Sequence, residues 1–222
     1  HPSVERKINP KALHDFLSFR AVTIPDSMIE GVKKLEPGSY LVYYNHDSLD
    51  PEKSYQADIT KYWTLTMKPE QPNEEHQARM VLSLLRQSIR RQLMSDVPLG
   101  VYLSGGIDSA TLVALMKPMV SEPINTFTVG FGIAEHQDEV SKAQFIVDHF
   151  KTNHHPITVK ADAAALLPKL VWHMDEPMSD ATSIPTYLLS QETKKHCTVV
   201  LTGEGSDEVF GGYVQYKIMK LH

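Results

Sequence analysis

The chain has 222 residues, a formal net charge of −5 and a hydrophobic fraction of 41%. This length allows one or two domains with a real core, and the composition is that of an ordinary globular protein, which excludes a disordered chain. Basic residues form no block longer than a pair, and no apolar run approaches the roughly 20 residues that cross a bilayer, so we expect neither nucleic-acid nor membrane partners. The first residues lack the apolar stretch of a signal peptide, which favours a cytoplasmic protein. The single cysteine, Cys197, precedes an apolar run and is expected to be a core residue.

The first part of the chain, residues 1–68, combines a short helix with two strands. Asn9-Pro10 is a capping residue followed by proline at the first helical position, and it predicts a helix start. Pro37-Gly38 predicts a turn, and the runs 39–44 and 59–65 are rich in strand-forming residues. Two strands cannot enclose a core of their own, so we expect this part to be the end of a larger β-containing domain whose body is absent.

The second part of the chain, residues 69–222, alternates strands with helices after one long helix. Asn73 caps that helix, and its apolar residues recur every three or four positions from Ala78 to Leu93, so we expect this stripe to lie on a core. The expected strands are 100–103, 126–129, 156–159 and 198–201, and the expected helices are 109–116, 139–150, 163–174 and 208 onward. This order predicts a parallel sheet with helices on its faces, which binds ligands at the carboxyl ends of its strands.

The loop after the first of these strands has the composition of a phosphate site. It runs from Leu103 through Ser104, Gly105, Gly106, Ile107 and Asp108 to Ser109. Glycines let the backbone approach a ligand, and the amides at a helix start attract anions, so the loop favours phosphate over an ordinary strand-to-helix turn. It lacks the Lys-Ser/Thr pair of a Walker A loop. A carboxylate beside phosphates would repel them unless a cation lay between, which makes Asp108 a candidate Mg²⁺ ligand.

The loop after the last expected strand is acidic and rich in glycine. It reads Thr202-Gly203-Glu204-Gly205-Ser206-Asp207-Glu208 and continues to Tyr213, with glutamate where a dinucleotide fingerprint requires its last glycine. Three carboxylates close together at the mouth of a sheet are unfavourable unless a cation or a proton-transfer task compensates them. The alternative is a solvated acidic helix start that its dipole stabilises.

Together these loops resemble those of the ATP-pyrophosphatase domain of glutamine-dependent asparagine synthetases. SGGIDS at 104–109 marks a wide superfamily, whereas three other segments are narrower, namely GEGSDEVFGGY at 203–213, DEP at 175–177 and SIPTYLLS at 183–190. Segments 12–19 and 34–42 resemble the last elements of the family's glutaminase domain. The resemblance implies an α/β fold for residues 69–222, a parallel sheet with helices on both faces of the adenine nucleotide alpha hydrolase-like (PP-loop) type. It implies a β-containing glutaminase remnant for residues 1–68.

The resemblance also implies a reaction and roles for individual residues. ATP would activate the aspartate side chain as β-aspartyl-AMP with release of pyrophosphate, and ammonia would then displace AMP to give asparagine. Pyrophosphate would bind to Ser104, Gly105, Gly106 and Ser109, and Mg²⁺ would bind to Asp108 and Asp207. Adenine and ribose would lie against Leu103, Val129, Thr202 and Gly203. Glu204 would be the catalytic residue. The implied cofactors are ATP and Mg²⁺, the partners are small-molecule substrates, and a homodimer is the candidate assembly.

The sequence departs from the family pattern at both ends. Full-length members begin with a glutamine-hydrolysing cysteine, whereas this chain begins with His1. They also continue through a C-terminal helical region that supplies a phosphate-binding lysine and part of the aspartate pocket, whereas this chain ends at His222. We therefore expect a fragment of a larger enzyme, without glutaminase activity of its own and with its turnover in question.

Two further functions are compatible with the same loops. One is a related ligase that closes a β-lactam or transfers an amide to another acid, and the other is a nucleotide-binding module without turnover. Among weaker signals, His149, His154 and His155 lack the spacing of metal ligands and favour structural roles. Asp180, Thr182 and Ser183 fit either a substrate contact or a plain helix start.

Overall fold

The computed structural model describes residues 2–45, 55–67, 73–130, 137–158, 163–177, 179–180 and 182–219. The chain forms two compact units. The first comprises residues 1–71 and 171–180, and the second comprises residues 72–170 and 181–222. Among the described residues, no helix combines the length and the apolarity needed to cross a membrane.

The described residues of the first unit form helix α1 (Pro10–Phe19), the last turn of helix α5 (Ala163–Met174) and a two-stranded ribbon. The Asn9 side chain accepts hydrogen bonds from the backbone N–H groups of Lys11 and Ala12, which confirms the predicted cap of α1. Strands β1 (Ser39–Asn45) and β2 (Tyr55–Lys61) pair antiparallel.

The second strand of this ribbon lies earlier in the chain than the aromatic run at 59–65 predicts. Strand β2 ends at Lys61, opposite Ser39, the first residue of β1. Just beyond, the carbonyl of Gly38 accepts from the N–H groups of both Tyr62 and Trp63, and Gly38 has a left-handed φ of 71°. Because the chain turns at this glycine just before β1 begins, residues 62–65 have no partner strand among the described residues.

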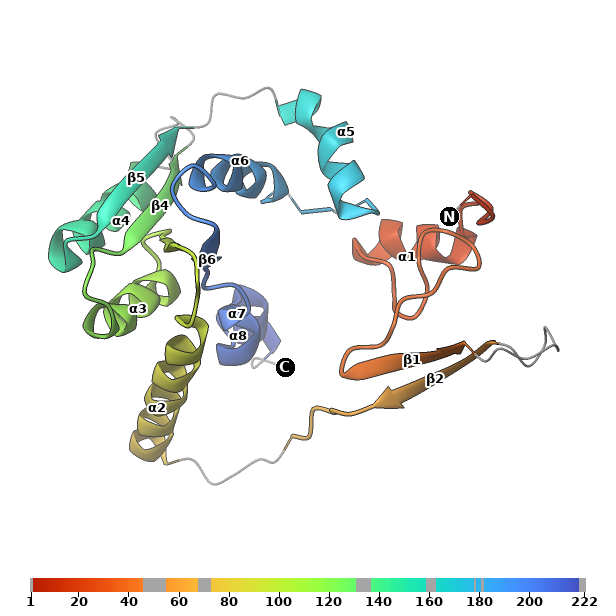
Figure 1. The fold of residues 1–222 in the computed structure, drawn as a ribbon, viewed down its shortest axis with the longest axis horizontal. Coiled ribbons are helices and arrows are strands. Elements are labelled where there is room, and N and C mark those ends of the chain that lie inside the picture. The colour runs from red at the N-terminus through yellow and green to blue at the C-terminus, as the bar shows by residue number, and fades with distance from the viewer. Residues whose placement is uncertain are drawn as a thin grey trace. The chain divides into compact units, whose positions relative to one another are not determined.

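The second unit is built on the predicted parallel sheet (Figure 1). Its strands are β3 (Leu99–Tyr102), β4 (Asn125–Gly130), β5 (Asn153–Thr158) and β6 (Val199–Leu201), in the order β5-β4-β3-β6. All three pairs are parallel. Each strand overlaps its predicted range, although Val159, the predicted end of β5, lies outside the described residues. The parallel α/β fold class is therefore confirmed.

The helices follow the strands as predicted, with one exception. They are α2 (Glu74–Gln92), α3 (Ile107–Met116), α4 (Gln137–Phe150), α5 (Ala163–Met174), α6 (Ser183–Thr193), α7 (Ser206–Phe210) and α8 (Val214–Met219), with a short 3-10 helix at Lys117–Met119. Only a capping signal at Thr182 and Ser183 pointed to α6. The helix predicted from Glu208 onward begins at Ser206 and stops at Gly211, whose left-handed φ of 67° separates α7 from α8.

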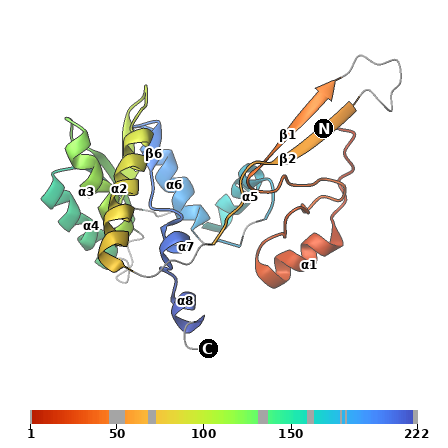
Figure 2. The same cartoon turned by 90° about the horizontal axis from the view of Figure 1, so that it is seen from below.

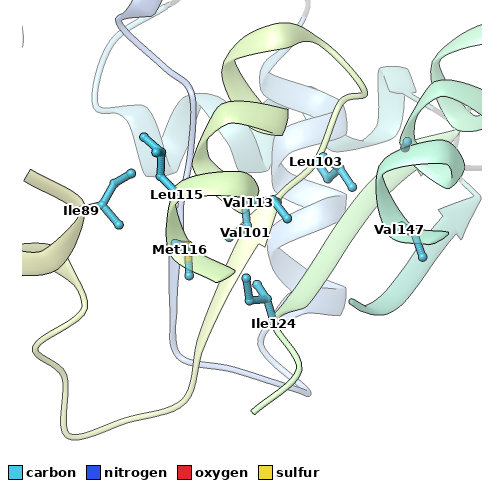
Figure 3. Packing of buried hydrophobic residues seen from close by; sticks show 9 residues of the cluster. Ile89, Val101, Leu103, Val113, Leu115, Met116, Ile124 and Val147 are labelled. Carbon is cyan, nitrogen blue, oxygen red and sulfur yellow. The ribbon is translucent and has the colours of Figure 1, made fainter. Parts of the chain in front are cut away.

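Two apolar clusters hold helices against the sheet. The larger joins β3 to α2, α3 and α4 through Ile89, Val101, Leu103, Val113, Leu115, Met116, Ile124, Ala143 and Val147 (Figure 3). The smaller joins Phe127 of β4, Leu189 of α6 and Cys197. Alternate residues of a strand point to opposite faces of the sheet. Val101 packs in the larger cluster and Tyr102 against the smaller one, so helices α3 and α4 cover one face of the sheet and α6 covers the other (Figures 1 and 2). Cys197 is a buried core residue, as predicted, and burial raises the pKa of its thiol.

The apolar stripe of α2 lies on the core only in its second half. Ile89 is buried and Leu85 and Leu93 are partly buried, whereas Val81 and Leu82 are 37% and 38% exposed. Helix α2 has 19 residues and α3, its packing partner, has 10, which correspond to roughly 28 Å and 15 Å of helix. The prediction that the whole stripe is covered is therefore wrong for the described residues, because α2 is longer than its partner.

Two histidines of β5 are expected to make the stability of the second unit dependent on pH. His154 lies 3.0 Å from the Thr126 hydroxyl, and the His155 ring stacks on Phe127 and lies 4.0 Å from the His196 ring between centroids. Burial lowers the pKa of both His154 and His155, and the neighbouring imidazole lowers it further. These contacts fit the structural roles favoured by the sequence.

A group with a lowered pKa in the folded state binds protons more readily once the chain unfolds. The stabilising contribution of His155 is therefore complete above its ordinary pKa of 6.5 and is lost as the pH falls below it. We expect the melting temperature to fall between pH 7.5 and pH 5, and to fall less in His155→Phe, which keeps a stacking ring but cannot be protonated. His149→Phe, on the exposed surface of α4, is the control and should keep the wild-type slope. An identical slope in His155→Phe would contradict the assignment.

Candidate active site

The loop after β3 is held by hydrogen bonds between its two serines. The Ser109 hydroxyl donates to the carbonyl of Gly106 at 3.2 Å and accepts from the N–H of Ser104 at 3.2 Å, and the two serine hydroxyls lie 3.1 Å apart. Gly105 has a left-handed φ of 75°, which favours glycine at this position. The serines therefore fix the shape of the loop as well as offering donors to a ligand.

Helix α3 begins directly after this loop. Its N-cap is Gly106, and no side chain among the described residues caps it. An uncapped helix start presents N–H groups and the positive end of the helix dipole to whatever lies in front of it. Asp108 lies in the first turn of α3, and Ser109 is buried. The positive helix start can bind an anion, and the Asp108 carboxylate can bind a cation that accompanies that anion.

The loop after β6 touches the first loop, because β6 and β3 are neighbours in the sheet. A Cβ atom on Gly203 would lie 3.0 Å from the Cβ of Asp108 and 3.5 Å from the backbone nitrogen of Ser109. The contact with Asp108 is tighter than usual and the contact with Ser109 is an ordinary one, so a side chain at 203 would press on Asp108, and glycine lets the two backbones approach. The two loops selected from the sequence therefore meet at one edge of the sheet.

The acidic part of the second loop folds into the short helix α7 between two left-handed glycines, Gly205 and Gly211. The N–H of Gly212 donates to the carbonyl of Asp207 at 3.0 Å, and a Cβ on Gly212 would overlap the Asp207 carboxylate. The Tyr213 hydroxyl donates to Glu208 Oε1 at 2.6 Å. This hydrogen bond lowers the pKa of Glu208 and raises the pKa of Tyr213 to about 12.

The two loops enclose a cavity of about 250 Å³ at the carboxyl ends of β3, β4 and β6. Nine of the eleven site residues proposed from the sequence line this cavity, and Gly105 and Gly106 do not. The nine are Leu103, Ser104, Asp108, Ser109, Val129, Thr202, Gly203, Glu204 and Asp207. The structure thus brings together side chains that are about a hundred positions apart in the sequence. Their individual roles remain predictions.

Several other residues of the lining were not selected from the sequence. They are Tyr102, Phe127, Thr128, Leu189, Gly205, Glu208 and Tyr213. Tyr102, Phe127 and Thr128 belong to the same two strands as the selected residues, so strand position alone could have indicated them. Leu189 lies on α6 and belongs to the SIPTYLLS segment at 183–190, so it could also have been chosen from that segment. Glu208 and Tyr213 belong to the GEGSDEVFGGY segment and could have been chosen from it.

The weaker candidates lie elsewhere. Asp180, Thr182 and Ser183 do not line the cavity, and Thr182 and Ser183 form the start of α6. Within the first unit, Glu176 of the Asp-Glu-Pro segment pairs with Lys34. The part of the chain that the structure describes contains no group of three or more His, Cys, Asp and Glu side chains able to hold a metal ion.

Comparison with known proteins identifies the family of this chain. The sequence pattern of the asparagine synthase family matches residues 80–222, which include both loops. The chain belongs to the asparagine synthase family. Its membership confirms the family that the two motifs indicated and makes the chain part of a family of enzymes.

Three relatives show how far the similarity extends. The chain is 36% identical over 218 residues to glutamine-hydrolyzing asparagine synthetase 1 of Bacillus subtilis, covering 95% of the chain and 32% of the relative. It is 32% identical over 203 residues to asparagine synthetase B of Escherichia coli, covering 83% and 34%. It is 26% identical over 208 residues to amidase chry2 of Gibberella zeae, covering 86% and 30%. The chain thus spans about a third of the length of these relatives.

Proposed function

We propose that this chain carries the ATP-dependent half-reaction of an asparagine synthetase. An oxygen of the aspartate side chain attacks the α-phosphorus of ATP, pyrophosphate leaves, and β-aspartyl-AMP forms. Ammonia, derived from glutamine in the full-length enzyme, then attacks the activated carbonyl, and AMP leaves with the displaced oxygen. The observation that carries the proposal is the single cavity that joins the serine-glycine loop to Glu204 and Asp207.

The phosphate end of ATP is assigned to the first loop. Ser104 and Ser109 line the cavity with their hydroxyls 3.1 Å apart, and α3 presents its uncapped N-terminus beside them. Gly105 and Gly106 would contribute through their backbone, since a glycine loop lets N–H groups reach phosphate oxygens. Adenine and ribose are assigned to Leu103, Val129, Thr202 and Gly203, at the ends of three neighbouring strands.

The residues of the cavity also fit Mg²⁺. Asp108 and Asp207 line the same space and offer the oxygen ligands that this ion prefers. Magnesium is usually held by one or two carboxylates together with substrate phosphates and water, so a pair of carboxylates beside a phosphate loop is a suitable set. When bound, the ion would neutralise charge on the phosphates and orient the leaving pyrophosphate.

Glu204 is assigned to the second step. Nitrogen that attacks a carbonyl must lose a proton to give a neutral amide, and a carboxylate positioned in the cavity can accept it. Glu204 follows Gly203 directly, and its N–H donates to the Thr202 hydroxyl at 3.4 Å, which ties it to the end of β6. The side chain is thus supplied by the same loop that approaches Asp108.

An isotope-exchange assay tests the proposal. We expect the purified protein to incorporate labelled pyrophosphate into ATP when aspartate and Mg²⁺ are present, because adenylation is reversible. Exchange that requires a different acid would favour a related ligase, such as one that forms a β-lactam. Binding of ATP without any exchange would favour a nucleotide-binding module without turnover.

Replacing Glu204 by glutamine should reduce asparagine formation about 100-fold, which is the lower range for the loss of a general base. Glutamine keeps the size and polarity of the side chain but cannot accept a proton. The measurement is asparagine formed from aspartate, ATP and ammonia. Glu192→Gln, on α6 and outside the cavity lining, is the control and should keep the wild-type rate. A wild-type rate in Glu204→Gln would exclude the role.

A further inference from the structure

The hydrogen bond between Tyr213 and Glu208 spans the turn on which the Asp207 carboxylate lies. Helix α7 ends at Gly211, and the N–H of Gly212 returns to the carbonyl of Asp207. Next in the chain, the Tyr213 hydroxyl donates to Glu208 at 2.6 Å. The backbone hydrogen bond thus joins Gly212 to Asp207, and the side-chain hydrogen bond joins the next residue, Tyr213, to Glu208.

This turn determines where the Asp207 carboxylate can lie. The space that a Cβ on Gly212 would occupy is filled by Asp207 Oδ1, so the carboxylate lies directly over the Gly212 backbone. A shift of that backbone would therefore change the support of the carboxylate. Tyr213 and Glu208 both line the cavity, but the hydroxyl of Tyr213 is engaged with Glu208. With a pKa of about 12, Tyr213 stays protonated and remains a donor at neutral pH.

We propose that Tyr213 is a positioning residue for divalent-cation binding, because its hydrogen bond to Glu208 fixes the turn that supports the Asp207 carboxylate. The inference rests on the proposed function, in which Asp207 is a ligand of the cation. Tyr213 acts on Asp207 through Glu208 and Gly212, because its hydroxyl is already engaged with Glu208. Its effect is therefore expected in the affinity for the cation, ahead of any effect on chemistry.

The test measures binding of Mn²⁺ to the purified protein in the presence of ATP, by electron paramagnetic resonance. Tyr213→Phe removes only the hydroxyl and should weaken Mn²⁺ binding about ten-fold, the lower end for the loss of a hydrogen bond to a charged group. Glu208→Gln keeps an oxygen that can accept from Tyr213 and should stay within about two-fold of wild type, as a neutral acceptor still holds the turn. Tyr216→Phe is the matched control, since its ring lies 5.9 Å from that of Tyr213 but outside the cavity lining.

The outcomes separate this inference from the proposed function. If the wild-type protein binds no Mn²⁺ with ATP, the proposed function fails and the inference fails with it. If wild type binds and Tyr213→Phe binds equally well, the inference alone is overturned. If Glu208→Gln is as weak as Tyr213→Phe, the negative charge of Glu208 matters and positioning by the hydrogen bond is overturned. Should Tyr213→Phe fold poorly, Glu208→Ala removes the same hydrogen bond from its other end, and a wild-type affinity in that variant would also overturn the inference.

Discussion

Replacing Asp108 by asparagine is expected to reduce aspartate-dependent pyrophosphate exchange about 1,000-fold. The carboxylate lies in the first turn of α3 and faces the cavity beside the serine-glycine loop. Without its charge the cation would lose one of two protein ligands, and the phosphates would lose much of their neutralisation. A metal that stabilises developing charge contributes several kcal/mol, and 1,000-fold corresponds to about 4 kcal/mol.

The same change has a separate and smaller effect on stability. A carboxylate in the first turn of a helix stabilises it by about 0.3–1 kcal/mol through the helix dipole, so the melting temperature of Asp108→Asn should fall slightly. Asp148→Asn is the matched control, because it removes an equal charge from α4, outside the cavity lining. Exchange in the control should equal that of wild type. If Asp108→Asn retained wild-type exchange at saturating Mg²⁺, Asp108 would not be a ligand.

The sequence was sufficient to predict the parallel sheet because each strand carries its own local signal. Val101 and Leu103 belong to a short apolar run that ends at Ser104, and Phe127 alternates with strand-forming threonines before Gly130, so both segments indicate strands without knowledge of the tertiary contacts. The loop containing Ser104 and the loop containing Glu204 could be linked for the same reason, since parallel strands direct their carboxyl ends to one edge.

Features set by contacts between distant residues were harder to predict. Nothing within 59–65 shows that its pairing stops at Lys61, because the limit is set by the turn at Gly38. The first half of α2 carries an apolar stripe like that of its second half, and which half is covered depends on where the core packs along the helix, at Leu85, Ile89 and Leu93. Leu189 lines the cavity because of where α6 packs on the sheet, and the local sequence of α6 does not determine that position.

Two neighbouring glycines of the second loop, Gly211 and Gly212, are each required for a different physical reason. Gly211 has a left-handed φ of 67°, and a Cβ there would meet only the Tyr216 ring, at 3.8 Å. Alanine at 211 would therefore strain the backbone by about 1–2 kcal/mol without touching the carboxylates. Gly212 has no left-handed φ, but its missing Cβ leaves the space that Asp207 Oδ1 occupies. Alanine at 212 would leave the backbone unstrained and displace the carboxylate.

Gly212→Ala is accordingly expected to reduce pyrophosphate exchange about 1,000-fold, as much as Asp207→Asn, since the first change displaces the carboxylate from the cation and the second removes its charge. Because the two changes act on one group, the double variant should be no worse than either single variant. Gly211→Ala should show the opposite pattern, with a lower melting temperature and nearly wild-type exchange. Exchange assays and thermal unfolding of the four variants check this pattern. If Gly211→Ala and Gly212→Ala lost exchange equally, general disorder of the turn would explain both, and the specific support of Asp207 by Gly212 would be refuted.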